Sequence, residues 1–208
     1  MFLMLLALLT PIDNRIPIYV LDTGIKEDKS YLCKEYKDMT GKGIKDVANH
    51  GWMVADLIGS NIDSTKYCIY MVKWCHTCDN LGTYTDSLAY IIKQQPKYLN
   101  ISAGGVDRDY FEEKMLKTMV DHGTKITVAS GNNKFNLDKR CFYYPACYPI
   151  NIHVVGALKT NKFDRGNYGH IVKEYLDGFY FDKKTNITYY GTSFSAPRAM
   201  ARIVNEDR

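Results

Sequence analysis

The sequence predicts an α/β fold in three layers, in which a mainly parallel sheet carries helices on both faces. Short apolar runs of strand length alternate along the chain with stretches whose apolar residues recur at helical spacing. Strands that alternate with helices form parallel sheets through right-handed crossovers. The length of 208 residues fits one domain with a single core, and the apolar and charged fractions are ordinary for a folded protein.

Five apolar runs are predicted to be strands, and they span residues 16–21, 68–74, 98–102, 125–129 and 152–156. Three of these strands end in small or polar segments. The segments are Asp22-Thr23-Gly24, Ala103-Gly104-Gly105 and Ser130-Gly131-Asn132. In open parallel sheets, ligands bind beyond the carboxyl ends of the strands. We therefore expect the three segments to lie at one shared site.

Four stretches are predicted to be helices, and they span residues 51–59, 86–93, 109–122 and 196–204. The apolar face predicted for the first consists of Met53, Val54, Leu57 and Ile58. The face predicted for the third consists of Phe111, Met115, Leu116 and Met119. Each helix has an apolar side of this kind, so each is expected to cover one face of the sheet.

The composition excludes some partners and leaves the cellular location open. The net charge is +4, and the lysines are scattered among acidic residues, so no nucleic-acid partner is expected. Residues 1–14 form an apolar N-terminal segment, and its first ten residues are too short to span a membrane as a helix. The segment is either the remnant of a secretory signal or a buried arm. We expect a monomer that is secreted or extracytoplasmic, or held near a membrane by this segment.

Six cysteines suit disulfides in an oxidising compartment. They are Cys33, Cys68, Cys75, Cys78, Cys141 and Cys147. Cys141 and Cys147 enclose a short loop and form the most plausible pair. The segment Cys75-His76-Thr77-Cys78 has the spacing of a zinc knuckle or a redox motif, but a single such segment is a weak metal signal. Disulfides or free thiols are favoured over a metal site.

Ser193 lies between small residues directly before the last predicted helix. At a helix N-terminus, unpaired N–H groups and the helix dipole favour a developing negative charge. A serine hydroxyl becomes a good nucleophile when a base takes its proton and another group orients that base. His50 is the candidate base and Asp22 is the candidate orienting carboxylate. The side chain of Asn132 and the backbone N–H of Ser193 are the candidate donors to an oxyanion.

Several segments resemble, in the same order along the chain, the motifs of the subtilisin-like serine proteases. They are Val20-Leu21-Asp22-Thr23-Gly24-Ile25, His50-Gly51-Trp52-Met53-Val54-Ala55, Asn100-Ile101-Ser102-Ala103-Gly104-Gly105, Ala129-Ser130-Gly131-Asn132, Tyr144-Pro145-Ala146-Cys147-Tyr148-Pro149 with Val154-Val155-Gly156-Ala157, and Gly191-Thr192-Ser193-Phe194-Ser195-Ala196-Pro197. The order Asp, His, Ser is also that of the subtilisins. The resemblance runs from about residue 16 to the C-terminus, so residues 15–208 are expected to form a subtilisin-like catalytic domain.

This resemblance implies an endopeptidase that acts through an acyl-enzyme, with Asp22, His50 and Ser193 as the triad and Asn132 in the oxyanion hole. It also implies that two segments bind extended peptide or protein substrates and wall the pocket for the residue preceding the scissile bond. These segments consist of Ser102, Ala103, Gly104 and Gly105, and of Ala129, Ser130 and Gly131. The loop 133–143 is expected to help shape this pocket.

The sequence departs from the family at several points. Relatives commonly fold with a prodomain, and none is visible before the first strand, so a prodomain-like partner or an inhibitor is an expected partner. The segment 59–68 is too short for the calcium-binding loop of many relatives, so no cofactor is expected and no calcium site can be identified. Two alternatives stay open, namely a catalytically silent module of this fold that binds or supports other proteins, and a zinc-binding module built on the cysteines with His76.

Overall fold

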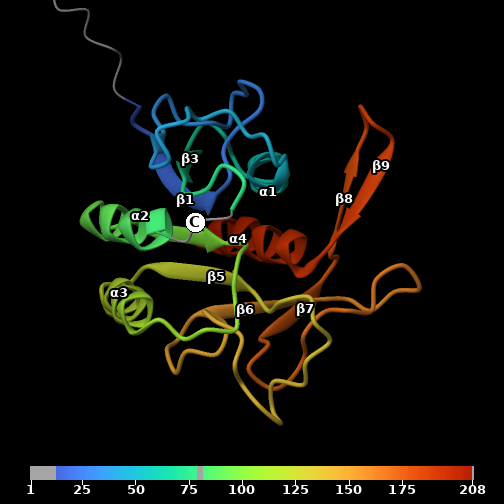
Figure 1. The fold of residues 1–208 in the computed structure, drawn as a ribbon. Coiled ribbons are helices and arrows are strands. Elements are labelled where there is room, and N and C mark those ends of the chain that lie inside the picture. The colour runs from blue at the N-terminus through green and yellow to red at the C-terminus, as the bar shows by residue number, and fades with distance from the viewer. Residues whose placement is uncertain (1–12, 79–81, 208) are drawn as a thin grey trace, which may run out of the picture.

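The computed structural model describes residues 13–78 and 82–207, and it confirms the predicted α/β fold (Figure 1). The main sheet consists of β1 (Ile16–Asp22), β2 (Lys37–Asp38), β3 (Tyr67–Lys73), β4 (Tyr98–Ile101), β5 (Lys125–Ala129), β6 (His153–Ala157) and β7 (Glu174–Leu176). Its strand order is β2-β3-β1-β4-β5-β6-β7, and all neighbouring strands run parallel. The five predicted strands are all present, each within one residue of its predicted ends.

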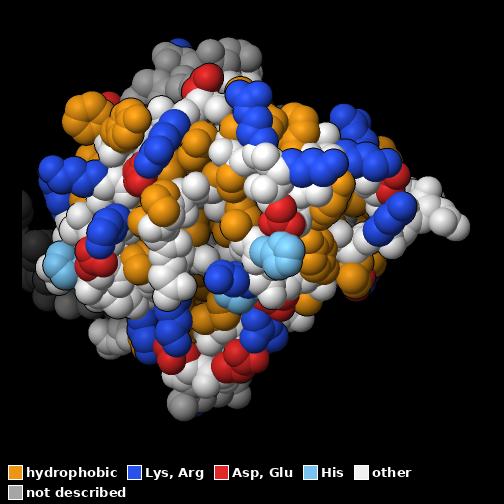
Figure 2. Space-filling view, turned by 90° about the horizontal axis from the view of Figure 1, so that it is seen from below, with side chains coloured by type: hydrophobic (Ala, Val, Ile, Leu, Met, Phe, Trp, Pro, Cys, Tyr) orange, Lys and Arg blue, Asp and Glu red, His pale blue; other side chains and the backbone are white. Residues whose placement is uncertain are grey.

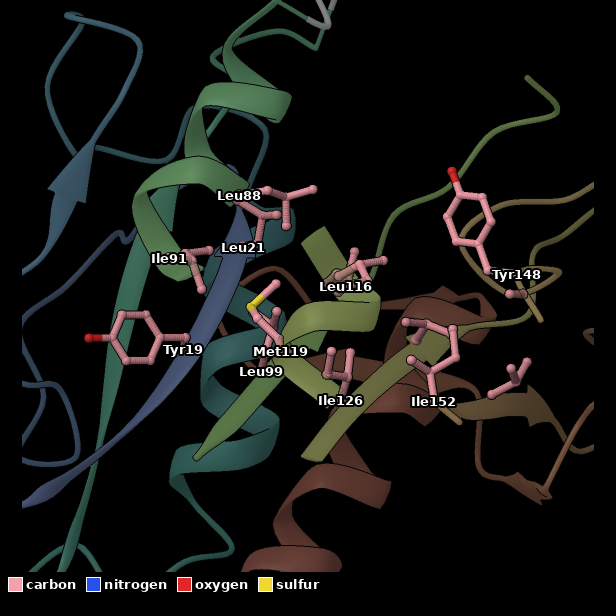
Figure 3. Packing of buried hydrophobic residues seen from close by; sticks show 14 of the residues in the cluster. Tyr19, Leu21, Leu88, Ile91, Leu99, Leu116, Met119, Ile126, Tyr148 and Ile152 are labelled. Carbon is pink, nitrogen blue, oxygen red and sulfur yellow. The ribbon is translucent and has the colours of Figure 1, made fainter. Parts of the chain in front are cut away.

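Two pairs of helices cover the two faces of this sheet. Helices α1 (His50–Gly59) and α4 (Ser195–Glu206) pack on one face, and α2 (Gly82–Lys93) and α3 (Tyr110–Asp121) pack on the other (Figure 1). Apolar side chains from α2 and α3 meet side chains of the strands in a continuous core (Figure 3). Strands that are buried on both faces need nearly unbroken apolar runs, which is why the sequence shows them so clearly.

The strand order brings the three predicted site segments to one edge of the sheet. β1 lies between β3 and β4, and β4 lies between β1 and β5. The chain leaves β1 for β3 on one side and later forms β4 on the other, so the carboxyl end of β1 is a switch point of the topology. Asp22 ends β1, Ser102 follows β4 and Ser130 follows β5 at this edge. The expectation of a shared edge is confirmed.

The sequence analysis does not predict four of the strands. β2 and β7 are short strands at the two edges of the main sheet. β8 (Phe179–Asp182) and β9 (Ile187–Tyr190) form an antiparallel hairpin that projects from the body of the molecule (Figure 1). Residues of β8 alternate between exposed and partly buried, and β9 is exposed at its first residue and partly buried at the other three, so the hairpin contains no fully buried strand.

The predicted apolar face of α3 is wrong at its first member. Leu116 and Met119 are buried, but Phe111 is 75% exposed and Glu112 takes a buried position instead. The Glu112 carboxylate accepts hydrogen bonds from the hydroxyls of Tyr84 at 2.6 Å and Tyr148 at 2.5 Å. Burial raises the pKa of Glu112. These two tyrosines explain how a carboxyl group replaces an aromatic ring on the inner side of the helix.

The cysteines form three disulfides, Cys33–Cys68, Cys75–Cys78 and Cys141–Cys147, and none of them is free. The predicted pair of Cys141 with Cys147 is confirmed. Because Cys75 and Cys78 are joined, they offer no thiolate to a metal ion. The predicted N-terminal segment 1–14 lies almost entirely outside the described residues. Within those residues, no helix has both the length and the apolar character needed to cross a membrane.

Charges of both signs are interspersed on the face shown in Figure 2, where lysines and arginines lie beside aspartates and glutamates. Ion pairs at the surface of the molecule include Lys134 with Asp164 and Arg202 with Glu206. Exposed pairs of this kind contribute little to stability. The distribution on this face agrees with the scattered charges of the sequence.

Candidate active site

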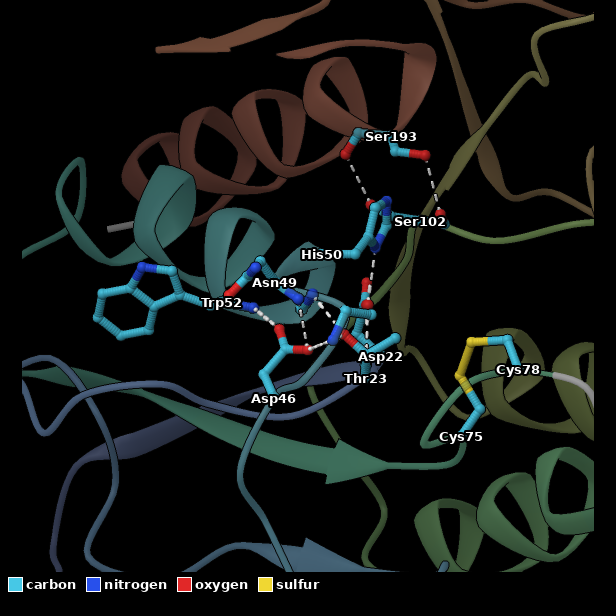
Figure 4. Close-up of polar contacts among 12 residues, drawn as sticks. Asp22, Thr23, Asp46, Asn49, His50, Trp52, Cys75, Cys78, Ser102 and Ser193 are labelled. Carbon is cyan, nitrogen blue, oxygen red and sulfur yellow. Dashed lines mark hydrogen bonds and ion pairs between the residues drawn. A yellow bond between two sulfur atoms is a disulfide. The ribbon is translucent and has the colours of Figure 1, made fainter. Parts of the chain in front are cut away.

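Asp22 and His50 form a hydrogen-bonded pair at the carboxyl end of β1. Asp22 is buried at the end of the strand, whereas His50 opens α1 with a side chain that is 32% exposed. The Nδ1 atom of His50 lies 2.8 Å from Oδ1 of Asp22 (Figure 4). An ionised carboxylate only accepts hydrogen bonds, so Nδ1 is the donor. In the neutral imidazole, Nε2 is therefore the atom that can accept a proton.

A second buried carboxylate, Asp46, organises the start of α1. Its Oδ1 accepts hydrogen bonds from the backbone N–H groups of Ala48 at 3.0 Å and Asn49 at 2.8 Å. Its Oδ2 accepts from the N–H of Trp52 at 2.9 Å (Figure 4). The first N–H groups of a helix have no partner within the helix, so Asp46 supplies acceptors that the start of α1 lacks.

Thr23 links the end of β1 to the start of α1. Its hydroxyl donates to Oδ1 of Asp46 at 2.9 Å and accepts from the backbone N–H of Gly51 at 2.8 Å. Thr23 follows Asp22 in the chain, and Gly51 follows His50. The link therefore holds the strand and the helix at the separation that the Asp22–His50 hydrogen bond requires.

The two carboxylates determine the proton affinity of His50. Burial by itself lowers the pKa of His50, but the charge and hydrogen bond of Asp22 and the charge of Asp46 outweigh it, so the pKa is raised above its ordinary value of 6.5. The Oδ2 atom of Asp22 is buried and has no hydrogen-bond partner among residues 13–78 and 82–207. This leaves much of the Asp22 charge available to stabilise an imidazolium at His50.

Ser193 lies in a short 3₁₀ turn, Thr192–Phe194, that leads directly into α4. Its hydroxyl donates a hydrogen bond to the Ser102 carbonyl at 3.0 Å, and the Ser102 hydroxyl donates to the Ser193 carbonyl at 2.9 Å (Figure 4). One hydroxyl carries one proton, so in this structure the Ser193 proton is directed at Ser102 and not at His50. Ser195, in contrast, is fully buried, and its hydroxyl donates to the Leu176 carbonyl at 3.2 Å.

A chain of buried hydrogen bonds leads to Ser102, which contacts Ser193. The Thr127 hydroxyl donates to Oδ1 of Asn100 at 2.9 Å, and Nδ2 of Asn100 donates to the Ser102 hydroxyl at 3.0 Å. Thr127 and Asn100 have no exposed surface. Buried polar groups that are fully paired rigidify their surroundings, so β4 and β5 position the turn that carries Ser193.

Asn132 lies beside the same turn. Its Oδ1 accepts hydrogen bonds from the backbone N–H of Thr192 at 2.9 Å and from the Thr192 hydroxyl at 3.0 Å. An amide nitrogen could not accept from the backbone N–H, so these contacts settle which side-chain atom is oxygen. The remaining Nδ2 group is a donor, and it lies next to Gly191.

The structure places the two predicted substrate-binding segments differently with respect to solvent. Ala103, Gly104 and Gly105 line an open cleft, together with Asp22 and His50. Ala129 and Ser130 are buried, and Gly131 is held by a hydrogen bond from its N–H to the Thr192 hydroxyl at 3.1 Å. The first segment can therefore contact an incoming chain directly.

The cleft has a volume of about 970 Å³ and is rich in aromatic side chains. Its aromatic lining consists of Trp74, Tyr84, Tyr110, Phe111, Tyr143 and Tyr144. Pockets of this size with a few polar groups are typical binding sites for peptides and small molecules. The exposed ring of Phe111 thus belongs to a wall of the cleft.

The described residues contain one cluster of potential metal ligands, Asp13 with Cys33 and Cys68. The two cysteines are joined in a disulfide, and Asp13 is paired with Arg15 at 2.8 Å. These partners occupy the atoms that would bind an ion, so the cluster is unsuitable as a metal site.

The sequence analysis missed Asp46, Thr23 and Asn100 as supports of the site. A usable signal existed for Asp46, because an aspartate shortly before a predicted helix is typical of helix capping. Nothing local in the sequence indicates that Asn100 supports a residue near the C-terminus, because their contact depends on the pairing of distant segments.

Fold and site together define an α/β protein with the arrangement of a serine hydrolase, an Asp–His pair near a serine at the start of a helix. The sequence model of the subtilase family matches residues 13–204. The chain therefore belongs to the subtilase family, which is a family of serine proteases. No curated protein sequence matches the chain.

Solved structures of proteases share the fold. A lanthipeptide protease has a TM-score of 0.76 and 16% identity, over 91% of this chain and 72% of that protein. A cold-adapted subtilisin-like serine proteinase has a TM-score of 0.73 and 18% identity, over 92% of this chain and 74% of that protein. The epidermin leader peptide processing protease of Staphylococcus aureus has a TM-score of 0.73 and 16% identity, over 92% of this chain and 65% of that protein. At such identities the likeness establishes the shared fold.

Proposed function

We propose that this protein is a serine endopeptidase that cleaves peptide bonds through Asp22, His50 and Ser193. The observation that carries the proposal is the 2.8 Å hydrogen bond between Asp22 and Nδ1 of His50, because it leaves Nε2 as a base near Ser193. The raised pKa of His50 suits a group that must first take up a proton and then release it.

In the proposed reaction, the Ser193 hydroxyl oxygen attacks the substrate carbonyl carbon while its proton moves to Nε2 of His50. The tetrahedral oxyanion accepts hydrogen bonds from Nδ2 of Asn132 and from the backbone N–H of Ser193. His50 then protonates the leaving amine as the carbon–nitrogen bond breaks. Water hydrolyses the resulting ester, again with His50 as base, and Ser193 regains its proton. None of these steps requires a metal ion, so we propose that the reaction needs no cofactor.

We propose that substrate binding releases Ser193 for this step. The Ser102 carbonyl accepts the Ser193 hydrogen bond at 3.0 Å. An extended substrate that pairs with the segment Ser102 to Gly105 would offer its own N–H groups to that backbone. A substrate N–H at the Ser102 carbonyl would compete with the Ser193 hydroxyl, which could then turn to His50.

The same observation favours a second candidate, a catalytically silent binding module, because a serine held by Ser102 is not poised to react. Purified protein with a peptide library and a serine-directed fluorophosphonate separates the two. The endopeptidase predicts cleavage and labelling of the wild type and the loss of both in Ser193→Ala, by about 10³-fold or more in kcat. Absence of cleavage and labelling in folded wild-type protein would contradict the proposal and support the silent module.

We further propose that the protein acts outside the cytoplasm, as a monomer. The disulfides Cys33–Cys68, Cys75–Cys78 and Cys141–Cys147 support an oxidising compartment. An inhibitor or prodomain-like partner would bind along the aromatic cleft. Gel filtration and thiol titration of protein isolated from its natural source would test both statements.

A further inference from the structure

The ring of Tyr143 lies between the two segments that are expected to wall the pocket for the residue preceding the scissile bond, here called the pre-scissile residue. A Cβ atom added to Gly104 would lie 2.7 Å from Cε1 and 3.0 Å from Cζ of this ring. A Cβ atom added to Gly131 would lie 2.7 Å from both of the same ring atoms. Non-bonded carbons at optimal contact are about 3.5–4.0 Å apart, so the ring packs directly against bare backbone at both glycines.

We propose that the Tyr143 ring fills this pocket and restricts the pre-scissile residue of substrates to glycine, alanine or serine. The inference rests on the proposed endopeptidase function and names its substrate class. A side chain that enters between Gly104 and Gly131 needs the volume that the ring occupies. Close-packed protein tolerates little extra volume, so a leucine or phenylalanine side chain would collide with the ring.

The backbone on both sides of the ring is held in place. The disulfide Cys141–Cys147 closes the loop that carries Tyr143, and the Cys147 N–H donates to the Tyr143 carbonyl at 2.9 Å. The next residue, Tyr144, exchanges two backbone hydrogen bonds with Gly105, at 2.7 and 2.8 Å. These contacts tie the loop to the substrate-binding segment itself, so a shift of the loop would disrupt that segment as well.

The shape of the cleft agrees with a filled pocket. Gly104 and Tyr143 both line the open cleft, and the Tyr143 ring also lies against Gly131, which is buried. The ring therefore lies between the cleft and the second wall. The Tyr143 side chain is half-buried, and this burial raises the pKa of its phenol.

The test uses one peptide series that differs only in the pre-scissile residue, which is glycine, alanine, serine, leucine or phenylalanine. For the wild type we expect kcat/KM to be at least about 100-fold higher with the three small residues than with the two large ones. Tyr143→Gly should raise the ratio of kcat/KM for leucine and phenylalanine to kcat/KM for glycine by about 10- to 200-fold. Tyr143→Phe keeps the ring and should keep the wild-type preference.

Tyr168→Ala serves as the matched control, because it removes a 44% exposed tyrosine on another loop and should leave the preference unchanged. A wild type that prefers leucine or phenylalanine would overturn the inference, since the ring would then have to swing aside. If Tyr143→Gly fails to fold by circular dichroism, the wild-type series and Tyr143→Phe still decide the question. Fluorophosphonate labelling of Ser193 keeps the two proposals separate: labelled protein with the wrong preference refutes only this inference, whereas unlabelled, inactive protein refutes the proposed function.

Discussion

The two halves of the site are both supported by buried hydrogen bonds, but only one of them carries charge. The base half consists of Asp22, Thr23, Asp46 and His50, and it contains two carboxylates beside an imidazole. The nucleophile half consists of Asn100, Ser102, Asn132 and Ser193, and all of its side chains are neutral. The base half therefore determines the proton affinity of His50, and the nucleophile half determines where the serine and the oxyanion donors lie.

This difference separates two kinds of defect. A change in the charged half should shift the pH dependence of the reaction, because a charge close to His50 alters the relative free energy of its two protonation states. A change in the neutral half should lower the rate by the same factor at every pH. Variants in both halves test this separation.

Among the variants that keep Asp22, His50 and Ser193, the largest effect is expected from Asn132→Ala in the neutral half. The variant removes Nδ2, the side-chain donor to the oxyanion, and also the Oδ1 acceptor of Thr192. We expect kcat to fall by about 10²- to 10³-fold with little change in KM, because the donor acts mainly in the transition state. The measurement is kcat and KM from pH 5 to 9, with Asn133→Ala, an exposed neighbour, as the control. If the acidic limb of the pH profile of kcat/KM shifted in Asn132→Ala, the proposed division between charged and neutral halves would be contradicted.

The parts of the site that the sequence predicted are those with local signals. Asp22 ends an apolar strand and Asn132 follows one, His50 begins α1, and Ser193 lies in the turn before α4, so their neighbours in the chain mark them. The fold class followed from the same alternation of strands and helices, since parallel strands are apolar along their whole length.

The parts that were missed depend on contacts between distant segments. The Tyr143 ring lies against Gly104 and Gly131 only because the loop pairs with the segment after β4. Glu112 took the inner position of α3 because Tyr84 and Tyr148 supply hydrogen bonds there. Periodicity alone describes one element at a time, so it cannot show which neighbours will receive a side chain.

In the charged half, Asp46→Asn should shift the pH profile. The reaction needs neutral His50, so kcat/KM rises as the pH increases through the His50 pKa, and the acidic limb should lie above pH 6.5 in the wild type. The charge of Asp46 helps to raise that pKa, so its removal should move the limb to lower pH. The same raised pKa stabilises the folded state when His50 is protonated, so this contribution is present below the unfolded pKa and is lost as the pH rises through the folded pKa.

Thr23→Val provides the matched comparison for Asp46→Asn. It removes the hydroxyl between Asp46 and the Gly51 N–H but leaves both carboxylates. Each variant leaves a buried polar group unpaired, so each should lower the free energy of unfolding by about 1–3 kcal/mol. Only Asp46→Asn should move the acidic limb. Urea unfolding and the pH profile of kcat/KM measure the two effects, and equal shifts in both variants would show that the hydrogen bonds, not the charge, set the His50 pKa.

Only a small effect on rate is expected from Ser102→Ala. This variant removes the hydroxyl that donates to the Ser193 carbonyl and accepts from Nδ2 of Asn100, but it keeps the Ser102 carbonyl. Loss of one positioning hydrogen bond of about 1 kcal/mol should lower kcat by up to about tenfold, and the acidic limb should stay where it is. Thr127→Val removes the far end of the same chain and should have a still smaller effect, because it leaves the contact with Ser193 intact. A larger loss in Thr127→Val than in Ser102→Ala would mean that the orientation of Asn100, and not the Ser102 hydroxyl, positions the serine.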